Sequence, residues 1–175
     1  GPTNGNVEFL NNVDITGGNF TLAKSNGSIL NLTTTESDIV NNEPIGTIKF
    51  YATNETGTAA NQLAASIVAS ASGTFDASNN PTDMVFSLGE TGTATEKMRI
   101  KSDGSVGIGT NSPAVDLHIL DTGGHSQLRI ETDSASHGAY LELESTTNKY
   151  QIYNVGGDLG IDESGVATRL TIKDS

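Results

Sequence analysis

Lys101-Ser102-Asp103-Gly104-Ser105-Val106 repeats, with small changes, an earlier phrase that reads Lys24-Ser25-Asn26-Gly27-Ser28-Ile29. Each phrase follows a strand-like apolar residue, Leu22 or Ile100. A third copy starts near the end of the sequence, where Met98-Arg99-Ile100-Lys101 returns as Leu170-Thr171-Ile172-Lys173. The second copy begins 77 residues after the first, and the third is shifted by 72 residues from the second. Repetition at such a period indicates one structural unit used several times along an elongated object, and it is untypical of an enzyme built around a single pocket.

The local pattern around the second phrase predicts a β-hairpin. Residues 98–101 and 106–108 read as strands, and the Asp103-Gly104 pair lies between them. Asn-Gly and Asp-Gly favour tight hairpin turns because both residues tolerate positive φ. The same alternation of apolar and polar residues predicts further strands at residues 47–51, 84–88, 117–119, 128–131, 141–144 and 170–172.

Two segments are compatible with either helix or strand. Residues 59–70 are rich in Ala and carry Leu63, Ile67 and Val68 at near-helical spacing, but Ala64, Ser66, Val68 and Ser70 also fit one face of a strand, which we favour. Ser112-Pro113 has the residues of a short helix start. The fold class we expect is all-β, as a trimeric sandwich, an interwoven prism or a β-helix. We expect three segments, an N-terminal repeat (1–45), a main β domain (46–120) and a second β segment (121–175). The boundary between the last two is expected at residues 121–124.

Composition limits the possible functions. The 175 residues include 34% hydrophobic and 5% aromatic residues, no Trp and 20 Gly, so each unit has few side chains for a core. We expect the chain to complete its burial against copies of itself. The net charge of −12 excludes a basic surface for nucleic acid. The absence of Cys excludes disulfides and thiol chemistry. No apolar run reaches membrane-spanning length, and the initial Gly1-Pro2 indicates an excised fragment.

Motifs for catalysis or cofactors are incomplete. Residues 107–112 begin like a dinucleotide fingerprint, but Ser112 stands where the third Gly belongs. Residues 103–107 have Asp103 where a hydrolase nucleophile elbow needs Gly. Residues 76–81 resemble half a calcium loop, but Pro81 replaces the Gly of that loop. We therefore expect close backbone approach at Gly107 and Gly109, and a polar turn at residues 76–81.

Histidines and carboxylates give the remaining candidate sites. His118, His125 and His137 are too scattered for a zinc site made by one chain, although His118 from three copies could meet on an axial cation. Glu142 with Glu144, and Asp162 with Glu163, are the nearest carboxylate pairs for sugar cleavage. The first pair lies on the polar face of a strand, which favours solvated charge. The sequence predicts no catalytic, cofactor or metal residue, and it leaves any binding residue unknown.

One longer pattern resembles a known family. It consists of Gly46-Thr47-Ile48-Lys49-Phe50, Gly73-Thr74, Met84-Val85-Phe86, Glu96-Lys97-Met98-Arg99-Ile100, Asp103-Gly104, Val106-Gly107-Ile108-Gly109-Thr110, Ser112-Pro113 and Leu117-His118-Ile119. This pattern resembles phage tail-fibre and related virion fibre proteins. It covers residues 46–119 well and residues 128–173 more loosely, through Arg169-Leu170-Thr171-Ile172-Lys173.

The resemblance implies a homotrimeric, elongated, β-rich structural protein of the virion that supports host attachment and has no catalytic role. Relatives often end in a self-cleaving intramolecular chaperone, which would here follow Ser175. Two alternatives remain. One is a carbohydrate- or receptor-binding module using loops at residues 51–60, 74–83 or 133–138, since exposed loops commonly carry binding residues. The other, which we favour less, is a polysaccharide depolymerase. No cofactor, nucleic acid or membrane insertion is expected.

Overall fold

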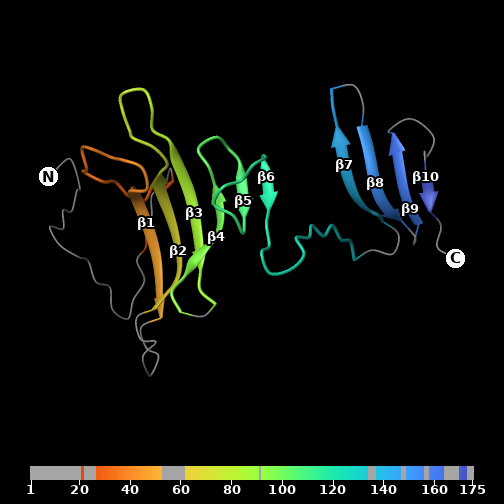
Figure 1. Ribbon diagram of the computed structural model, residues 1–175, viewed down its shortest axis with the longest axis horizontal. Helices are drawn as coiled ribbons and strands as arrows, with labels where there is room; N and C mark the ends of the chain where they lie inside the picture. The colour runs from red at the N-terminus through yellow and green to blue at the C-terminus, as the bar shows by residue number, and fades with distance from the viewer. Residues whose placement is uncertain are drawn as a thin grey trace. The chain divides into compact units, whose positions relative to one another are not determined.

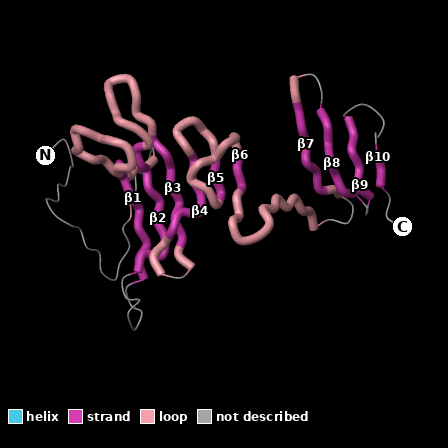
Figure 2. The backbone as a smooth tube through the Cα atoms, in the orientation of Figure 1, coloured by secondary structure: helices cyan, strands magenta, loops and turns pink. Residues whose placement is uncertain are grey.

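The computed structural model describes residue 21 and residues 27–52, 62–90, 92–133, 137–146, 149–155, 158–163 and 170–172. Within these ranges the protein is all-β, with ten strands and no helix (Figures 1 and 2). This confirms the fold class expected from the alternation of apolar and polar residues. The chain divides into two compact units, Gly1–His118 and Ile119–Ser175, and each is described by itself.

The first sheet contains six strands that follow one another in sequence order. They are β1 (Pro44–Ala52), β2 (Gln62–Ala71), β3 (Thr82–Leu88), β4 (Thr95–Ile100), β5 (Val106–Ile108) and β6 (Leu117–Ile119). Pairs β1–β2, β2–β3, β3–β4 and β4–β5 are antiparallel. The sheet is therefore a meander, in which each strand pairs with its neighbour in sequence (Figure 1).

The repeated phrase forms the turn of the β4–β5 hairpin, as the sequence predicts. Lys101 N–H donates to the Ser105 carbonyl at 2.9 Å, and Gly104 N–H donates to the Lys101 carbonyl at 2.9 Å. Gly104 has a φ of 90°, a conformation that side chains with a Cβ rarely adopt. Gly27 holds the same place in the first copy and has a φ of 95°. The two copies thus share the backbone conformation of their glycine; residues 24–26 lie outside the described residues.

Residues 62–70 of the Ala-rich segment belong to the interior strand β2, which resolves the helix-or-strand ambiguity in favour of the strand. Ile67 pairs with Ile48 of β1 on one side and with Phe86 of β3 on the other. Cross-strand pairs of this kind stabilise a sheet more than intrinsic helix propensity opposes it.

The register gathers apolar residues on one side of the first sheet, here called the apolar face, with Thr82 and Thr95 at its margins. Cross-strand partners share a face, so one row crosses all five registered strands as Ile48, Ile67, Phe86, Met98 and Ile108. A second row contains Gly46, Ala69, Met84, Ile100 and Val106. Phe50 and Leu88 extend the face beyond these rows. The opposite side, here called the polar face, includes Thr47, Ser66, Asp83, Glu96 and Arg99.

The two faces differ in burial. Among the described hydrophobic residues only Ala71 is buried, whereas Phe50 on the apolar face is 52% exposed and Ile108 is 40% exposed. The buried polar residues, Ser66 and Asp83, both belong to the polar face. The single layer of strands therefore leaves its apolar face in contact with solvent, and it encloses its polar groups more fully than its apolar ones.

The second sheet has the same design in four strands. These are β7 (Ala139–Glu144), β8 (Lys149–Val155), β9 (Asp158–Glu163) and β10 (Leu170–Ile172), again antiparallel and in sequence order. One row joins Leu141, Ile152, Ile161 and Leu170, so this sheet also has an apolar row, with Asn154 and Glu163 on the same side. On the other side the Tyr140 and Tyr153 rings lie 5.4 Å apart between centroids.

Some local predictions are wrong. Residues 128–131 are not a strand, and Leu128 and Ile130 are exposed. Apolar and polar residues do alternate in this segment, but no neighbouring strand pairs with its backbone. Ser112-Pro113 starts no helix and lies in a bend. Strands β8 and β9 were missed. The joint at residues 121–124 stays a prediction; the division into two units lies between His118 and Ile119.

Candidate functional site

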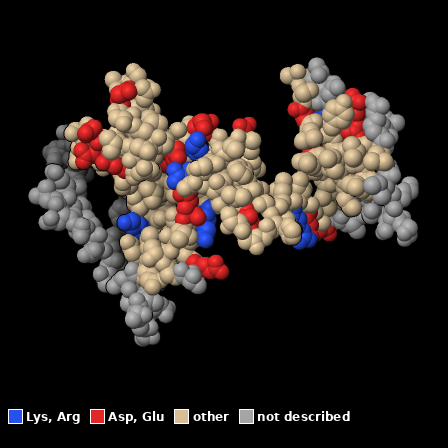
Figure 3. All heavy atoms as spheres, viewed as in Figure 1, with Lys and Arg blue, Asp and Glu red and all other residues tan. Residues whose placement is uncertain are grey.

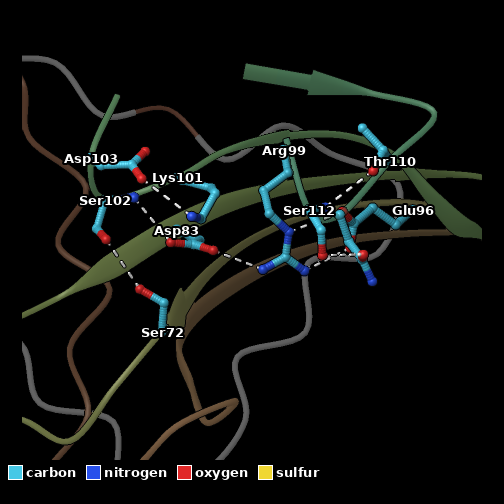
Figure 4. Close-up of polar contacts among 10 residues, drawn as sticks. Ser72, Asp83, Glu96, Arg99, Lys101, Ser102, Asp103, Thr110 and Ser112 are labelled. Atoms are coloured by element: carbon cyan, nitrogen blue, oxygen red, sulfur yellow. Dashed lines mark hydrogen bonds and ion pairs between the residues drawn. The ribbon is translucent and has the colours of Figure 1, made fainter. Parts of the chain in front are cut away.

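An ion-pair network occupies the polar face of the first sheet. The Arg99 side chain of β4 donates from Nη1 to Asp83 Oδ2 at 2.8 Å. It also donates to both Glu96 oxygens, from Nε at 2.9 Å and from Nη2 at 2.7 Å. Figure 4 shows the guanidinium between the two carboxylates. Paired Arg–carboxylate contacts of this kind fix both partners in one geometry.

Asp83 also anchors the hairpin turn. Its Oδ1 accepts a hydrogen bond from Ser102 N–H at 3.0 Å, and Ser72 Oγ donates to Ser102 Oγ at 3.3 Å (Figure 4). Burial raises the pKa of Asp83, but hydrogen bonds from Arg99, Ser72 and Ser102 outweigh burial and lower the pKa below its usual value. The pKa of Arg99 is raised, first by its hydrogen bonds to Glu96 and then by those to Asp83, against the opposing effect of burial. Asp83 and Arg99 are therefore both charged at neutral pH.

A shallow hollow of about 550 Å³ lies beside this network. Its walls are mostly hydroxyl and amide groups, contributed by Gly73, Thr74, Asp76, Ser78, Asn79, Asn80, Pro81 and Ser102. Ser102 links the hollow to Asp83, so the polar network positions one wall. Most of its lining falls within residues 74–83, one of the three loops named as a possible binding surface.

Asp76 shapes the opposite wall as a polar turn, as predicted. Its Oδ1 accepts hydrogen bonds from Ser78 N–H at 2.7 Å and Asn79 N–H at 2.9 Å. Asn79 Nδ2 also donates to the same carboxylate at 3.0 Å. The hydrogen bond from the Asn79 side chain, followed by that from Ser78, lowers the pKa of Asp76. The carboxylate thus serves to fix the loop conformation.

The turn of the hairpin is fixed in the same way. Asp103 Oδ1 accepts from Ser105 N–H at 2.9 Å, and Lys101 Nζ lies 3.2 Å from Asp103 Oδ2. The Ser105 hydrogen bonds and then Lys101 lower the pKa of Asp103 to about 2. Asp103, at the position where a nucleophile elbow would need Gly, therefore closes a turn.

The glycine-rich stretch that begins like a dinucleotide fingerprint is a strand and a bend. Gly107 lies in β5, and a Cβ there would lie 2.3 Å from the Thr110 carbonyl oxygen. Gly109 has a φ of 75°. Close backbone approach at Gly107 is thereby confirmed. A pyrophosphate site of the fingerprint type also needs a helix N-terminus, and residues 110–116 form bends and coil.

The candidate carboxylate pairs differ in geometry. Glu142 and Glu144 lie on the same side of β7 with Lys149 between them, at 3.1 and 3.4 Å. Hydrogen bonds from Gln151 and then Lys149 lower the pKa of Glu142, which is unfavourable for a general acid because such a group must hold its proton near neutral pH. Asp162 and Glu163 are adjacent on β9 and point to opposite faces.

The histidines do not come together within the described residues. His118 lies in β6 and its Nδ1 accepts from Ala114 N–H at 3.4 Å, and His125 and His137 are exposed. In the part of the chain that is described, no group of three or more His, Asp or Glu side chains is placed to hold a metal ion. Nor does any helix there have the length and apolar character needed to cross a membrane.

Two of the three predicted binding loops fall partly outside the description. Residues 53–60 and 134–136 lie outside the described residues. The Asp83–Arg99–Glu96 network was not anticipated from the sequence. One sequence feature could have indicated this network: its charged residues lie inside predicted strands, although only 17% of the residues in the chain are charged. Figure 3 shows acidic and basic groups lying side by side on the visible face of the first unit.

A scan of the sequence against protein-family models finds no match, and a search of curated proteins finds none either.

Proposed function

We propose that this chain is a non-catalytic structural segment of a phage-type virion fibre, and that it works as a homotrimer that supports host attachment. The observation that carries the proposal is the pair of single-layer sheets, each with apolar rows that contain solvent-exposed side chains. A chain of this size normally buries about 70% of its surface by folding alone. A protein that leaves ordered apolar rows exposed instead is suited to burying them by association.

The repeated phrase supports the same proposal. Gly27 and Gly104 occupy equivalent positions in the two copies of the phrase and have similar positive φ values. A structural unit used repeatedly along a chain extends its reach without requiring a large core in each unit. The acidic charge of the chain also limits non-specific adhesion to other acidic surfaces.

The test is the absolute mass of the protein in solution, measured by light scattering behind a sizing column. We expect the mass of three chains of 18.1 kDa each. A folded particle of one-chain mass over a wide range of concentrations would contradict the proposal, because the exposed rows would then have no partner. Circular dichroism of the same fractions establishes that the particle is folded.

A second candidate function is binding of a host glycan or receptor, and the hollow at residues 73–81 is the observation that favours it. Hydroxyl and amide side chains line this hollow, and such groups hydrogen-bond well to sugar hydroxyls. A glycan array tests this function. Binding that is lost in Asn79→Ala and Thr74→Ala but kept in Thr47→Ala would support it, and an array without signal would contradict it.

A polysaccharide depolymerase is a weaker third candidate. The lowered pKa of Glu142 and the contact of Lys149 with both Glu142 and Glu144 do not favour acid catalysis at that pair. Incubation with a host polysaccharide, followed by an assay for released reducing ends, tests it directly. Released sugar would contradict the non-catalytic proposal.

A further inference from the structure

The apolar face of the first sheet is continuous through its two central rows. Its two central rows contain ten residues, each of which is apolar or glycine, and they run through β1 to β5 without interruption. Segment 27–43 approaches the face at its β1 edge, where a Cβ on Gly46 would lie 3.1 Å from the Leu32 Cβ. Phe50, Met84, Leu88 and Ile108 remain exposed.

The size of this face matches what an association surface needs. Neighbouring strands lie about 4.8 Å apart and each residue advances about 3.4 Å. Five registered strands with about six residues each therefore present a flat area on the order of 500 Å². The relief of the side chains adds to this value. A stable protein interface buries about 800 Å² on each partner, so this one face supplies most of a standard interface.

Charge decides what can occupy the face. The chain carries a net charge of −12, so identical copies repel one another wherever acidic surfaces meet. The apolar rows contain no carboxylate, whereas the reverse side of the same sheet carries Asp83 and Glu96. The apolar face is therefore the side of this sheet on which two copies can approach without bringing like charges together.

Shape favours the same occupant. Sheets pack face to face at about 10 Å when both sides are apolar and their twists are compatible. A second copy of the chain offers a face of identical twist and identical apolar character. It also offers the row of Leu141, Ile152, Ile161 and Leu170, which gives the second sheet the same need for a cover.

We propose that the apolar face of the first sheet is the contact surface between copies of this chain, with the Ile48–Ile67–Phe86–Met98–Ile108 row at its centre and the polar face directed to solvent. This inference rests on the proposed function, because it assumes self-association. It adds which side of the sheet is buried between the copies and which residues form the contact.

Two adjacent residues of β1 provide a matched test. Phe50 is 52% exposed and lies on the apolar face, and Tyr51 is 51% exposed. The register shift between them leaves Ala64 of β2 as the extra residue, so β1 itself keeps its alternation and Tyr51 projects from the opposite face. Phe50→Glu and Tyr51→Glu therefore introduce the same charge at sites of equal exposure in the isolated chain. We expect Phe50→Glu to lower the mass measured by light scattering to that of a single chain, and Tyr51→Glu to keep the wild-type mass.

A second measurement covers the case in which Phe50→Glu fails to fold. The protein has no cysteine, so Phe50→Cys and Tyr51→Cys each introduce a unique thiol into the assembled protein. We expect iodoacetamide to alkylate the thiol from Phe50→Cys at least about tenfold more slowly, because reaction there requires local separation of the copies. Equal rates, which match the equal exposure of Phe50 and Tyr51 in one chain, would overturn the proposal.

The outcomes separate the two levels of inference. A wild-type protein of single-chain mass overturns both the homotrimer and the contact surface. A wild-type trimer whose Phe50→Glu variant keeps its mass and whose two thiols react equally fast overturns the contact surface alone and leaves the proposed function standing. A trimer with a slow thiol only at Tyr51→Cys would place the contact on the polar face instead.

Discussion

Arg99 donates a hydrogen bond from Nη1 to Asp83 Oδ2 at 2.8 Å across the polar face, and Asp83 is only 2% exposed. The two residues lie on neighbouring strands, β4 and β3, and Arg99 pairs in register with Val85, two positions along from Asp83. The contact therefore joins diagonal neighbours on one face of the sheet. It ties the strand that enters the repeated hairpin to the strand before it.

Removing the buried carboxylate should destabilise the first unit. We expect Asp83→Ala to lower the free energy of unfolding by about 2 kcal/mol, because it leaves Arg99 with one carboxylate fewer and Ser102 N–H without its acceptor. Glu131→Ala, which breaks the exposed pair with Arg129, is the control and should change stability by less than about 0.5 kcal/mol. Urea unfolding followed by circular dichroism measures both; equal effects would show that burial of the Asp83 pair is unimportant.

Acid should lower the stability of the folded protein through Asp83. The pKa of Asp83 is lowered in the folded protein, so the unfolded chain binds more protons at low pH. The stabilisation is complete above about pH 4, near the ordinary pKa of Asp, and it is lost as the pH falls through the lowered folded value. Asp103, whose pKa is about 2, adds to the same effect. We expect melting temperatures to decline between about pH 4 and pH 2, and to decline less in Asp83→Asn. An identical acid profile in Asp83→Asn would contradict this assignment.

Two glycines of the hairpin should respond differently to the same substitution. At Gly104 a Cβ meets nothing within 4 Å, and only the φ of 90° opposes a side chain, so Gly104→Ala should cost about 1 kcal/mol. At Gly107 the added Cβ would lie 2.3 Å from the Thr110 carbonyl oxygen, so the backbone must shift. We expect Gly107→Ala to cost about 3 kcal/mol. Denaturant unfolding of the pair compares them, and a larger loss in Gly104→Ala would refute the close approach at Thr110.

Tyr153 should stabilise the second sheet through its hydroxyl group. The hydroxyl donates to Asp162 Oδ2 at 2.8 Å, and Asp162 Oδ1 is buried without a hydrogen-bond partner in the described part of the chain. The ring lies over Gly160, where a Cβ would come within 2.2 Å of Tyr153 Cζ. Tyr153→Phe keeps the ring and should lower the stability of this unit by about 1 kcal/mol.

Tyr140→Phe provides the control for Tyr153→Phe, because it alters the neighbouring ring of the same pair. Its expected effect is smaller than that of Tyr153→Phe. Calorimetry that resolves the transition of the second unit measures both variants. Equal stability losses in the two would show that the hydrogen bond to Asp162 contributes little.

Much of the first sheet could be predicted because its strands carry local signals. The β4–β5 hairpin follows from alternating residues on each side of an Asp-Gly turn, and the turn needs only the conformational freedom of Gly104. Strand β2 was ambiguous because Ala favours helices, and pairing with Ile48 and Phe86 decides its conformation. Residues 128–131 have the alternation of apolar and polar residues that predicts a strand, but they do not form one because no strand pairs with them.

The polar network could not be predicted, because it depends on register. A bulge between Phe86 and Ser87 places Glu96, rather than Lys97, opposite Ser87 on the face that carries Arg99. A shift of one residue would have put these charges on the apolar face. The hollow beside Ser102 has the same origin, since it joins residues 73–81 to a turn more than twenty positions away in the sequence.

The sequence by itself determined the all-β class, the hairpin of the repeated phrase and the shortage of core residues, because alternation, turn chemistry and composition are local properties. The tertiary structure decided how the strands are registered, and thereby that the apolar residues gather on one exposed side of a single layer while Asp83 and Arg99 pair on the other. Register is a relation between distant segments, so it is fixed by pairing and not by any segment alone.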